Sequence, residues 1–335
     1  RGFDAQLALK AMQQTAEGNQ FGLKWYRQKG YIPADRDGSS VSKTLEYAYD
    51  DWCIAEMALS LGEKEIAEEF YLRSQNWKNL YDPESGFFRA RVNNGWFGPF
   101  LPEEVNFNYT EANAWQYSLF VPHDIYGLSD LKPEGLEVHL DNMFAASSAT
   151  SGREQADITG LIGQYAHGNE PSHHMAYLYN YTNNPSKTQS MTNLIMNKMY
   201  QNAPDGLSGN EDCGQMSSWY IMTALGLYQI APGNPYYELT RPLTNEASIK
   251  LENGKILNIK TNDSGNDDLF IDSVFFNGKL IEGSFISHEA LLEGGILEYK
   301  LAALPNSNNN GKPHAPTIKS IPQEFVSLPY FNETE

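Results

Sequence analysis

The sequence predicts a mainly α-helical protein whose stacked helices are followed by a small module of β-strands. Three observations lead to this prediction. Apolar residues recur at helical spacing in successive segments from residue 3 to about residue 230. After the Pro- and Gly-containing segment 231–235, the apolar period changes to the alternation that is typical of strands. Two Asn-Gly pairs, at 253–254 and 277–278, are hairpin signals within that second part.

The composition indicates a packed globular chain with a strongly acidic character. Of the 335 residues, 41% are hydrophobic and 13% aromatic, more than a disordered chain carries. No run approaches the ~18 apolar residues that a membrane helix needs. Lys and Arg number 24 against 42 Asp and Glu, a formal charge of -18, so we expect neither nucleic acid nor a membrane as partner. Cys53 and Cys213 are too far apart for a disulfide framework or a zinc motif.

The helical part is expected to hold eight or nine helices. Its longest apolar stripe, from Leu45 to Leu59, predicts a long helix with one buried face. Residues 82–105 are predicted to be a loop with one short hairpin at Asn93-Asn94-Gly95. Further helix starts are predicted at Thr110 (with a stop at Pro122), near residue 136, at Asp157, at Ser172, at Pro185 and just before Met216. The residues expected to face inward include Phe3, Leu7, Ala11 and Met12 in the first helix and Met191, Leu194, Ile195 and Met199 in the seventh.

Such a series of helices is typical of stacked helical hairpins, as in a bundle, a solenoid or an α/α toroid. We find no fixed-period repeat, which counts against a solenoid. The predicted domains are a helical domain over 1–235, a β module over 236–303, and a polar linker with an extended tail over 304–335.

The chain starts at Arg1 without a signal segment and enters a helical pattern almost at once. We interpret it as a processed product or as part of a longer polypeptide. Four Asn-X-Ser/Thr triplets are compatible with a secreted protein, although such triplets also arise by chance. They begin at Asn108, Asn180, Asn262 and Asn332.

The most informative segment, Gly209–Tyr220, places two acids on a Gly-bounded turn directly before an amphipathic helix. Asn210 or Asp212 could cap that helix, which is the ordinary role of such a side chain. The alternative is that Asp212 presents its carboxylate at the helix start for chemistry.

A second acid, Glu111, stands beside Asn113, Trp115 and Gln116. An acid in the first turn of a helix is favoured by the helix dipole without any catalytic role. A general acid there needs burial and a second negative charge to raise its pKa, and Asp212 could supply that charge. Two carboxylates that flank one bond are the equipment of glycoside hydrolysis, in which one protonates the leaving oxygen and the other activates water.

A third cluster combines two oxygen-bearing side chains with three histidines. Asn169 and Glu170 suit a hard cation such as calcium better than zinc. The histidines could indicate zinc instead, but His173 and His174 are adjacent and cannot converge as residues i and i+4 of a helix do. A polar loop capped by Ser172 is the alternative without a metal.

In a fourth cluster, Glu46 and Asp50 share a helix face, where they repel each other. A sugar, a cation or plain solvation would relieve the repulsion. Trp52, Trp96 and Trp115 could stack on sugar faces, although a single tryptophan is more often part of a core.

Taken together, four long blocks closely resemble the signature segments of glycoside hydrolase family 92, and the resemblance extends over about residues 1–303. Members of this family are calcium-dependent, inverting exo-α-mannosidases. The resemblance implies an (α/α)6 toroid, preceded by an N-terminal β-sandwich and followed by further strands, here a small antiparallel β module. Because such a toroid needs twelve helices, we expect the sandwich and the remaining helices upstream of Arg1. The four blocks are Val41–Ala55, Tyr109–Asp124, Gly163–Tyr181 and Gly206–Gly233.

The resemblance also implies roles for single residues. Glu111 matches the family's general acid, and Asp212 matches the general base that activates water. Members often carry a second Asp where this chain has Asn210, so Asp212 is expected to act alone. Asn169 and Glu170 match the block that holds calcium. The residues expected to contact the sugar are Asn210, Trp115, Gln116 and His167.

The function that the resemblance implies is removal of terminal α-linked mannose, with α-1,2 linkages preferred, from N-glycan-type or mannan chains. Inversion predicts a separation of roughly 6.5–9.5 Å between the two catalytic carboxyls. The enzyme is expected to be secreted, periplasmic or at the cell surface. The alternatives are a weak or inactive mannose-binding fragment that lacks its N-terminal domain, or another chemistry on the same fold, such as a lyase.

Overall fold

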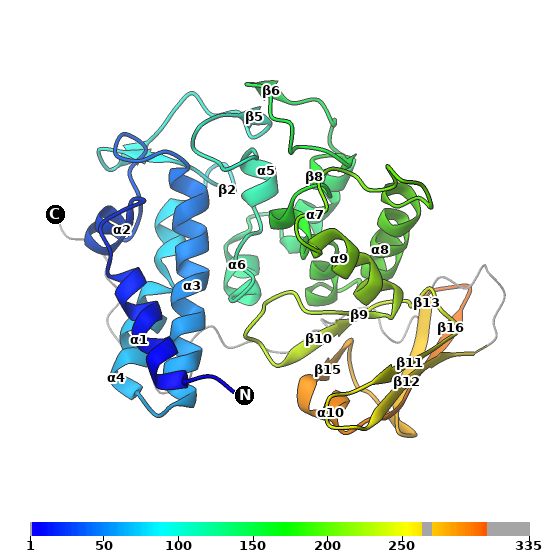
Figure 1. The fold of residues 1–335 in the computed structure, drawn as a ribbon. Helices are drawn as coiled ribbons and strands as arrows, with labels where there is room; N and C mark the ends of the chain where they lie inside the picture. The colour runs from blue at the N-terminus through cyan, green and yellow to red at the C-terminus, as the bar shows by residue number, and fades with distance from the viewer. Residues whose placement is uncertain (1, 263–269, 307–335) are drawn as a thin grey trace. The chain divides into compact units, whose positions relative to one another are not determined.

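The computed structural model describes residues 2–262 and 270–306, and the chain forms two compact units. The tail predicted for 304–335 lies, from residue 307 onwards, outside this description. Figure 1 shows the path of the chain. The described part of unit 1 comprises residues 2–133 and 149–155, and that of unit 2 comprises residues 134–148, 156–262 and 270–306.

Unit 1 is built around α3, the long helix predicted between Leu45 and Leu59. Helices α1 and α4 pack against it, and the shared core contains Leu9, Trp52 and Phe70. The predicted inward face of the first helix is wrong in part: Met12 packs against the core, but Leu7 is 63% exposed while Leu9 is buried. Asp4 caps the helix, so Phe3 precedes it and the buried stripe starts at Leu9. The elements are α1 (Ala5–Ala16), α2 (Leu23–Lys29), α3 (Ser40–Ser60), α4 (Lys64–Arg73) and the 3-10 helix η1 (Asn76–Leu80).

The rest of unit 1 consists of short strand pairs and two short helices. The hairpin predicted at Asn93-Asn94-Gly95 is confirmed, and both asparagines adopt left-handed backbone conformations, with φ of 51° and 63°. The fourth helix is much shorter than predicted and ends long before Pro122. The elements are β1 (Tyr81–Asp82), β2 (Phe87–Phe88), β3 (Arg91–Val92), β4 (Gly95–Trp96), β5 (Glu104–Val105), α5 (Ala114–Tyr117), α6 (Ile125–Leu131) and β6 (Ser151–Gly152).

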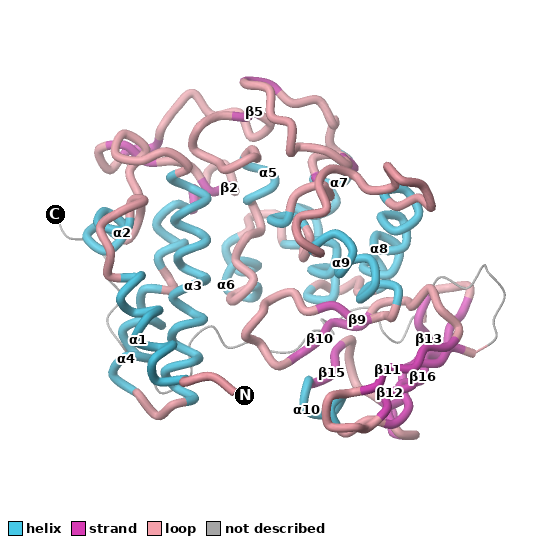
Figure 2. Tube along the Cα trace, viewed as in Figure 1, coloured by secondary structure: helices cyan, strands magenta, loops and turns pink. Residues whose placement is uncertain are grey.

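Unit 2 contains three longer α-helices, and Figure 2 shows the loops and short turns that join them. The helices predicted to start at Asp157 and Ser172 are wrong. The first is a hairpin of β7 and β8, in which Gly163 has a φ of 60° and packs so tightly on the carbonyl of Met143 that no side chain fits. The second is a pair of 3-10 helices. The elements are α7 (Leu136–Ala145), β7 (Leu161–Ile162), β8 (Tyr165–Ala166), η2 (Glu170–Ser172), η3 (Met175–Tyr181), α8 (Ser186–Met199) and α9 (Gln215–Ala224).

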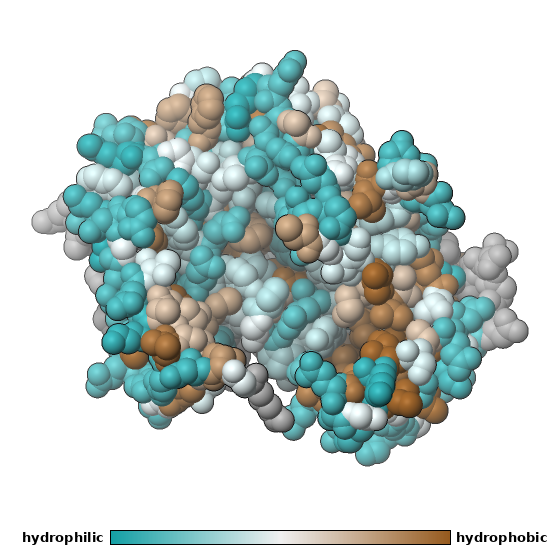
Figure 3. Space-filling model, viewed as in Figure 1, coloured by the Kyte–Doolittle hydropathy of each residue, from teal (hydrophilic) through white to brown (hydrophobic). Residues whose placement is uncertain are grey.

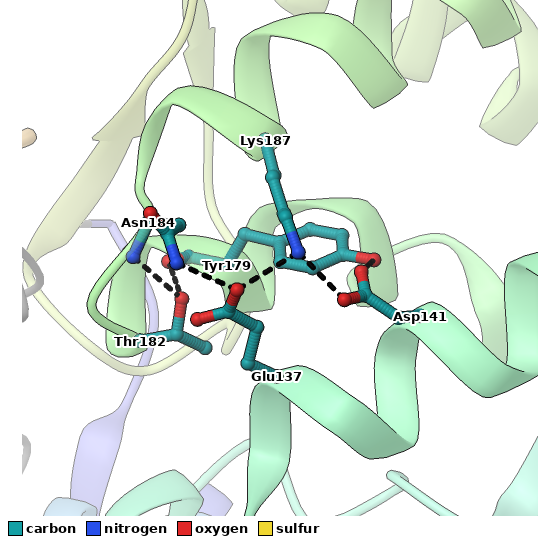
Figure 4. A network of polar contacts seen from close by, with 6 residues as sticks. All are labelled: Glu137, Asp141, Tyr179, Thr182, Asn184 and Lys187. Atoms are coloured by element: carbon teal, nitrogen blue, oxygen red, sulfur yellow. Dashed lines mark hydrogen bonds and ion pairs between the residues drawn. The ribbon is translucent and has the colours of Figure 1, made fainter. Parts of the chain in front are cut away.

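A polar network joins α7 to η3 and the start of α8 (Figure 4). Lys187 donates to Glu137 at 2.8 Å and to Asp141 at 2.6 Å. The hydroxyl of Tyr179 donates to Asp141 at 2.9 Å, and the amide of Asn184 donates to Glu137 at 2.6 Å. One ammonium group therefore bonds two carboxylates. These contacts hold the start of α8, which follows Asn184-Pro185 as predicted, against α7.

Strands follow residue 235, as the alternating pattern predicts, and they belong to unit 2. Its five-stranded sheet has the order β11-β12-β16-β13-β14, and a smaller sheet has the order β15-β10-β9. The module predicted to be antiparallel contains one parallel pair, because β12 and β16 run in the same direction. The elements are β9 (Leu227–Tyr228), β10 (Tyr236–Leu239), β11 (Glu246–Lys250), β12 (Ile256–Thr261), β13 (Phe270–Phe276), β14 (Lys279–Leu280), β15 (Phe285–Ser287), α10 (His288–Leu292) and β16 (Gly295–Ala302).

Alternating side chains of the five-stranded sheet form the module's core, which includes Ile259, Leu297 and Tyr299. The opposite face leaves residues such as Ile256 and Ile296 partly exposed, and Figure 3 shows hydrophobic surface over the β module. Among all helices of residues 2–262 and 270–306, none has both the length and the apolar character required to cross a bilayer.

Candidate active site

The turn that carries Asp212 adopts an uncommon backbone conformation. Asp212 and Cys213 both lie in the left-handed region, with φ of 53° and 56°, and Gly214 follows with a φ of 103° as the N-cap of α9. Left-handed backbone costs roughly 1–2 kcal/mol for each non-Gly residue, so other contacts must hold this turn. Strain of this kind is concentrated at functional sites.

The side chain that serves the start of α9 is Glu211, not Asn210 or Asp212 as predicted. Its Oε2 accepts a hydrogen bond from the N–H of Gly214 at 2.5 Å, and its Oε1 accepts one from the N–H of Ser217 at 3.3 Å. Among the described residues, no hydrogen bond or ion pair engages the carboxylate of Asp212, which is exposed. Asp212 is thus not occupied as a cap.

Two buried histidines lie beneath this turn, and their hydrogen bonds define their tautomers. Tyr200 donates its proton to the carbonyl of Met216 at 3.0 Å, so His167 must donate from Nε2 to Tyr200 at 2.7 Å. His167 Nδ1 then accepts from Tyr165 at 2.8 Å. Burial lowers the pKa of His167 to about 2, so the ring is neutral.

His173 is neutral for the same reason and connects this cluster to α9. Its Nε2 donates to the carbonyl of His167 at 2.9 Å, which leaves Nδ1 to accept from the amide of Gln215 at 3.1 Å. Burial lowers the pKa of His173 to about 4. No ring nitrogen of His167 or His173 is left for a metal or a sugar hydroxyl. The rings of His167 and His173 thus have structural partners, and the sugar contact of His167 stays a prediction.

The turn that carries Glu111 has the same backbone feature in unit 1. Glu111 has a φ of 51° and is exposed, and the N–H of the preceding Thr110 donates to Ser42 of α3 at 2.8 Å. Helix α5 is capped by Asn113, so the predicted cap at Thr110 is wrong and Glu111 precedes the helix instead of lying in its first turn.

Gln116 completes the cap of α5. Asn113 accepts from the N–H of Trp115 at 3.0 Å, while Oε1 of Gln116 accepts from the N–H of Asn113 at 2.7 Å, which forms a capping box. The ring of Trp115 packs edge-on against Phe87, with centroids 4.7 Å apart. These contacts give both residues a structural role, and their sugar contacts stay predictions.

Asn169 and Glu170 lie at the start of η2, with Asn169 nearly buried. Their oxygens have the right chemistry for calcium, which takes six to eight oxygen ligands. Two side chains are too few, and the part of the chain that the structure describes gathers no group of three or more His, Cys, Asp or Glu side chains suited to a metal ion. Calcium binding at Asn169 and Glu170 therefore stays a prediction that needs further oxygen ligands.

The remaining predicted groups have structural environments. Glu46 accepts from the hydroxyl of Tyr117 at 3.0 Å, and Trp52 is buried in the unit 1 core. Asn180 is also buried and donates to Glu238 at 2.7 Å, so this triplet cannot carry a glycan in the folded chain. The triplet at Asn332 lies outside the described residues.

Comparison with known proteins assigns the chain to a family. The profile of the glycosyl hydrolase family 92 catalytic domain matches residues 1–303. The chain therefore belongs to glycoside hydrolase family 92, as the four sequence blocks indicate.

Three relatives illustrate the match. A family 92 α-mannosidase of Bacteroides thetaiotaomicron, solved in complex with mannoimidazole, is 35% identical, with a TM-score of 0.89 over 95% of this chain and 44% of that chain. A second family 92 enzyme of the same species, described as an inverting mannosidase, is 33% identical, with a TM-score of 0.84 over 94% of this chain and 46% of that chain. An uncharacterized secreted glycosidase of Arthroderma benhamiae is 28% identical over 88% of this chain and 41% of that protein. The chain spans less than half the length of each of these relatives.

Proposed function

We propose that this protein is an exo-acting α-mannosidase that releases terminal mannose with inversion. The observation that supports this most directly is that neither predicted acid is used as a cap. The cap of α5 is Asn113, and the cap of α9 is served by Glu211. Glu111 and Asp212 are both exposed in left-handed turns instead. In a family 92 chain, such acids are candidates for chemistry.

In the proposed mechanism, Asp212 takes a proton from water as the water oxygen attacks the anomeric carbon. The bond from that carbon to the leaving oxygen breaks, and Glu111 gives its proton to this oxygen. The products are mannose of inverted anomeric configuration and the shortened glycan. An inverting mechanism leaves room for this water between its acid and its base.

Finer features belong to the same proposal. We propose α-1,2-linked mannose on N-glycan-type or mannan chains as substrate, an enzyme outside the cytoplasm, and helices that belong to an (α/α)6 toroid. Asn169 and Glu170 would contribute to binding calcium only together with oxygen ligands from elsewhere, such as substrate hydroxyls or water. Treatment with a chelator that abolishes activity, followed by recovery with calcium, would support this part.

The test is to incubate α-1,2-mannobiose with this chain, and with a longer polypeptide that contains it, while following the products by proton NMR. The proposal predicts that β-mannose appears first and then equilibrates with the α anomer. First appearance of α-mannose would exclude inversion, and an unsaturated sugar would indicate a lyase. Binding of mannose without release by either form would favour the alternative of a mannose-binding protein.

A further inference from the structure

The turn Glu211–Gly214 combines unfavourable backbone with an unusually complete set of contacts. Asp212 and Cys213 are both left-handed, and a residue in that conformation persists only when the surroundings impose it. The backbone contributes hydrogen bonds from the N–H of Gln215 to the carbonyl of Asp212 and from the N–H of Met216 to the carbonyl of Glu211, each at 3.2 Å. These two bonds are long, so they hold the turn only weakly.

The carboxylate of Glu211 closes the turn from the solvent side. Its two oxygens accept from two N–H groups at the start of α9, those of the N-cap Gly214 and of Ser217 in the first turn. Hydrogen bonds from Ser217 and Gly214 lower the pKa of Glu211, so the group is charged at neutral pH. A charged acceptor near a helix start also gains from the helix dipole.

The buried side of the same turn is held by neutral groups. The amide of Gln215 donates to His173, and the carbonyl of Met216 accepts from Tyr200. The first turn of α9 is thus held by buried groups, His173 and Tyr200, and by the carboxylate of Glu211. The carboxylate of Asp212 takes part in neither set of contacts.

We propose that Glu211 is a positioning residue, whose carboxylate binds the N–H groups of Gly214 and Ser217 and thereby keeps Asp212 in the left-handed conformation that directs its carboxylate to water. This role rests on the proposed function, because it assigns Asp212 as the base. Glu211 itself touches neither the substrate nor the water. Its effect on the reaction passes entirely through Asp212.

The test compares Glu211→Ala and Glu211→Gln in the full chain, with Ser287→Ala as the matched control. Ser287 caps α10 by accepting from the N–H of Ala290 at 3.1 Å, so its loss removes a helix cap far along the sequence from the turn. We expect Glu211→Ala to lower kcat by about 10- to 100-fold with little change in KM, because a small misplacement of a catalytic group has effects of this size. Glu211→Gln keeps one acceptor oxygen and should fall between wild type and Glu211→Ala. Ser287→Ala should leave kcat unchanged.

A double variant separates positioning from direct catalysis. If Glu211 acts through Asp212, adding Glu211→Ala to Asp212→Asn should lower kcat no further, because residues that act as a unit are not additive. An unchanged kcat in Glu211→Ala, or a further multiplicative loss in the double variant, would overturn the proposal.

A second measurement separates failure of this inference from failure of the proposed function. Absence of mannose release by the wild type would refute the function, but hydrogen exchange would still test the contacts. Exchange of the amides of Gly214 and Ser217 should accelerate in Glu211→Ala and stay at the wild-type rate in Ser287→Ala. Equal exchange rates in wild type and Glu211→Ala would overturn the holding role of Glu211.

Discussion

The turns that carry Glu111 and Asp212 differ in the residue that caps the helix after the acid. Each turn places an acid in the left-handed region just before a helix, and in each a different residue serves the helix start. Before α5, the cap is a neutral pair, Asn113 with Gln116. Before α9, the charged side chain of Glu211 accepts hydrogen bonds from the N–H groups of Gly214 and Ser217.

The difference lies in what stabilises each turn. The turn at Glu111 is attached to the core of unit 1 by neutral hydrogen bonds, including one from the N–H of Thr110 to Ser42. The turn at Asp212 is held by the carboxylate of Glu211 and by two neutral contacts, from Gln215 to His173 and from Tyr200 to the carbonyl of Met216. In both turns a neighbouring residue serves the helix start, and the proposed function assigns the acid itself to chemistry.

The largest effect should come from Asp212→Asn, which removes the base and keeps the size of the side chain. A general base contributes about 10²–10⁴-fold, so we expect kcat to fall by about 10³-fold. Asp205→Asn, an exposed acid in the same loop region, is the control and should change kcat by less than about 2-fold. Similar small losses in both variants would refute the role of Asp212.

Glu111→Gln should show a loss that depends on the leaving group. On α-1,2-mannobiose we expect kcat to fall by about 10²-fold, because the departing sugar oxygen needs a proton. On an aryl mannoside with an acidic phenol the loss should be much smaller. Glu84→Gln, an exposed glutamate of unit 1, serves as control. A loss of equal size on both substrates would contradict the acid role.

The free energy of unfolding should depend on pH through the buried amine of Lys132, which contacts the end of α5. Lys132 donates to the carbonyls of Gly86 and Ser118, and Ser118 ends α5. Burial lowers the pKa of Lys132 to about 7, against about 10.4 in the unfolded chain. Between these values the unfolded state binds the extra proton, so stability should rise with pH, by up to about 1.4 kcal/mol per unit.

Denaturant unfolding at pH 7 and pH 9 measures this effect. Lys132→Met should lose the rise, whereas Lys187→Met in unit 2 should keep it. Desolvation lowers the pKa of Lys187, but the hydrogen bonds to Asp141 and Glu137 and the charges of these two acids together raise it above its usual value, so the group keeps its proton over this range. An equal rise in wild type and Lys132→Met would show that Lys132 is not the source.

The smallest effect concerns the strain itself. Glu111→Gly and Asp212→Gly should each stabilise the fold by about 1 kcal/mol, because glycine adopts the left-handed region without steric cost, while activity is lost. Glu68→Gly, in the right-handed helix α4, should instead destabilise by about 1 kcal/mol. Destabilisation by all three substitutions would argue that the two turns are unstrained.

Sequence reasoning located the long elements because their patterns extend over several helical turns. The positions of α3, α8 and α9, and the change to strands after residue 235, follow from apolar period and caps. The seven-residue helices α2 and α6 were not predicted, because they are too short to show a period. The segment from Asp157 to Tyr181 was misassigned because hairpins and 3-10 turns containing apolar residues also place such residues three and four apart.

Within the candidate site, the sequence did not predict the capping role of Glu211 or the burial of His167. Capping preferences describe residue types, and Asp212 is a better cap by type than Glu211. Which of two adjacent acids reaches the N–H groups depends on backbone angles that the sequence does not display. A glutamate three residues before the N-cap Gly214 was the available signal for Glu211. The burial of His167 results from tertiary contacts with Tyr165 and Tyr200.

The most direct test of the assignment of Asp212 is azide rescue of Asp212→Ala on an aryl α-mannoside. Azide is a nucleophile that needs no base, so it can replace the water that Asp212 activates. We predict that azide restores turnover and yields β-mannosyl azide. Failure of azide to restore turnover in Asp212→Ala, with rescue of Glu211→Ala in its place, would contradict the assignment and identify Glu211 as the base.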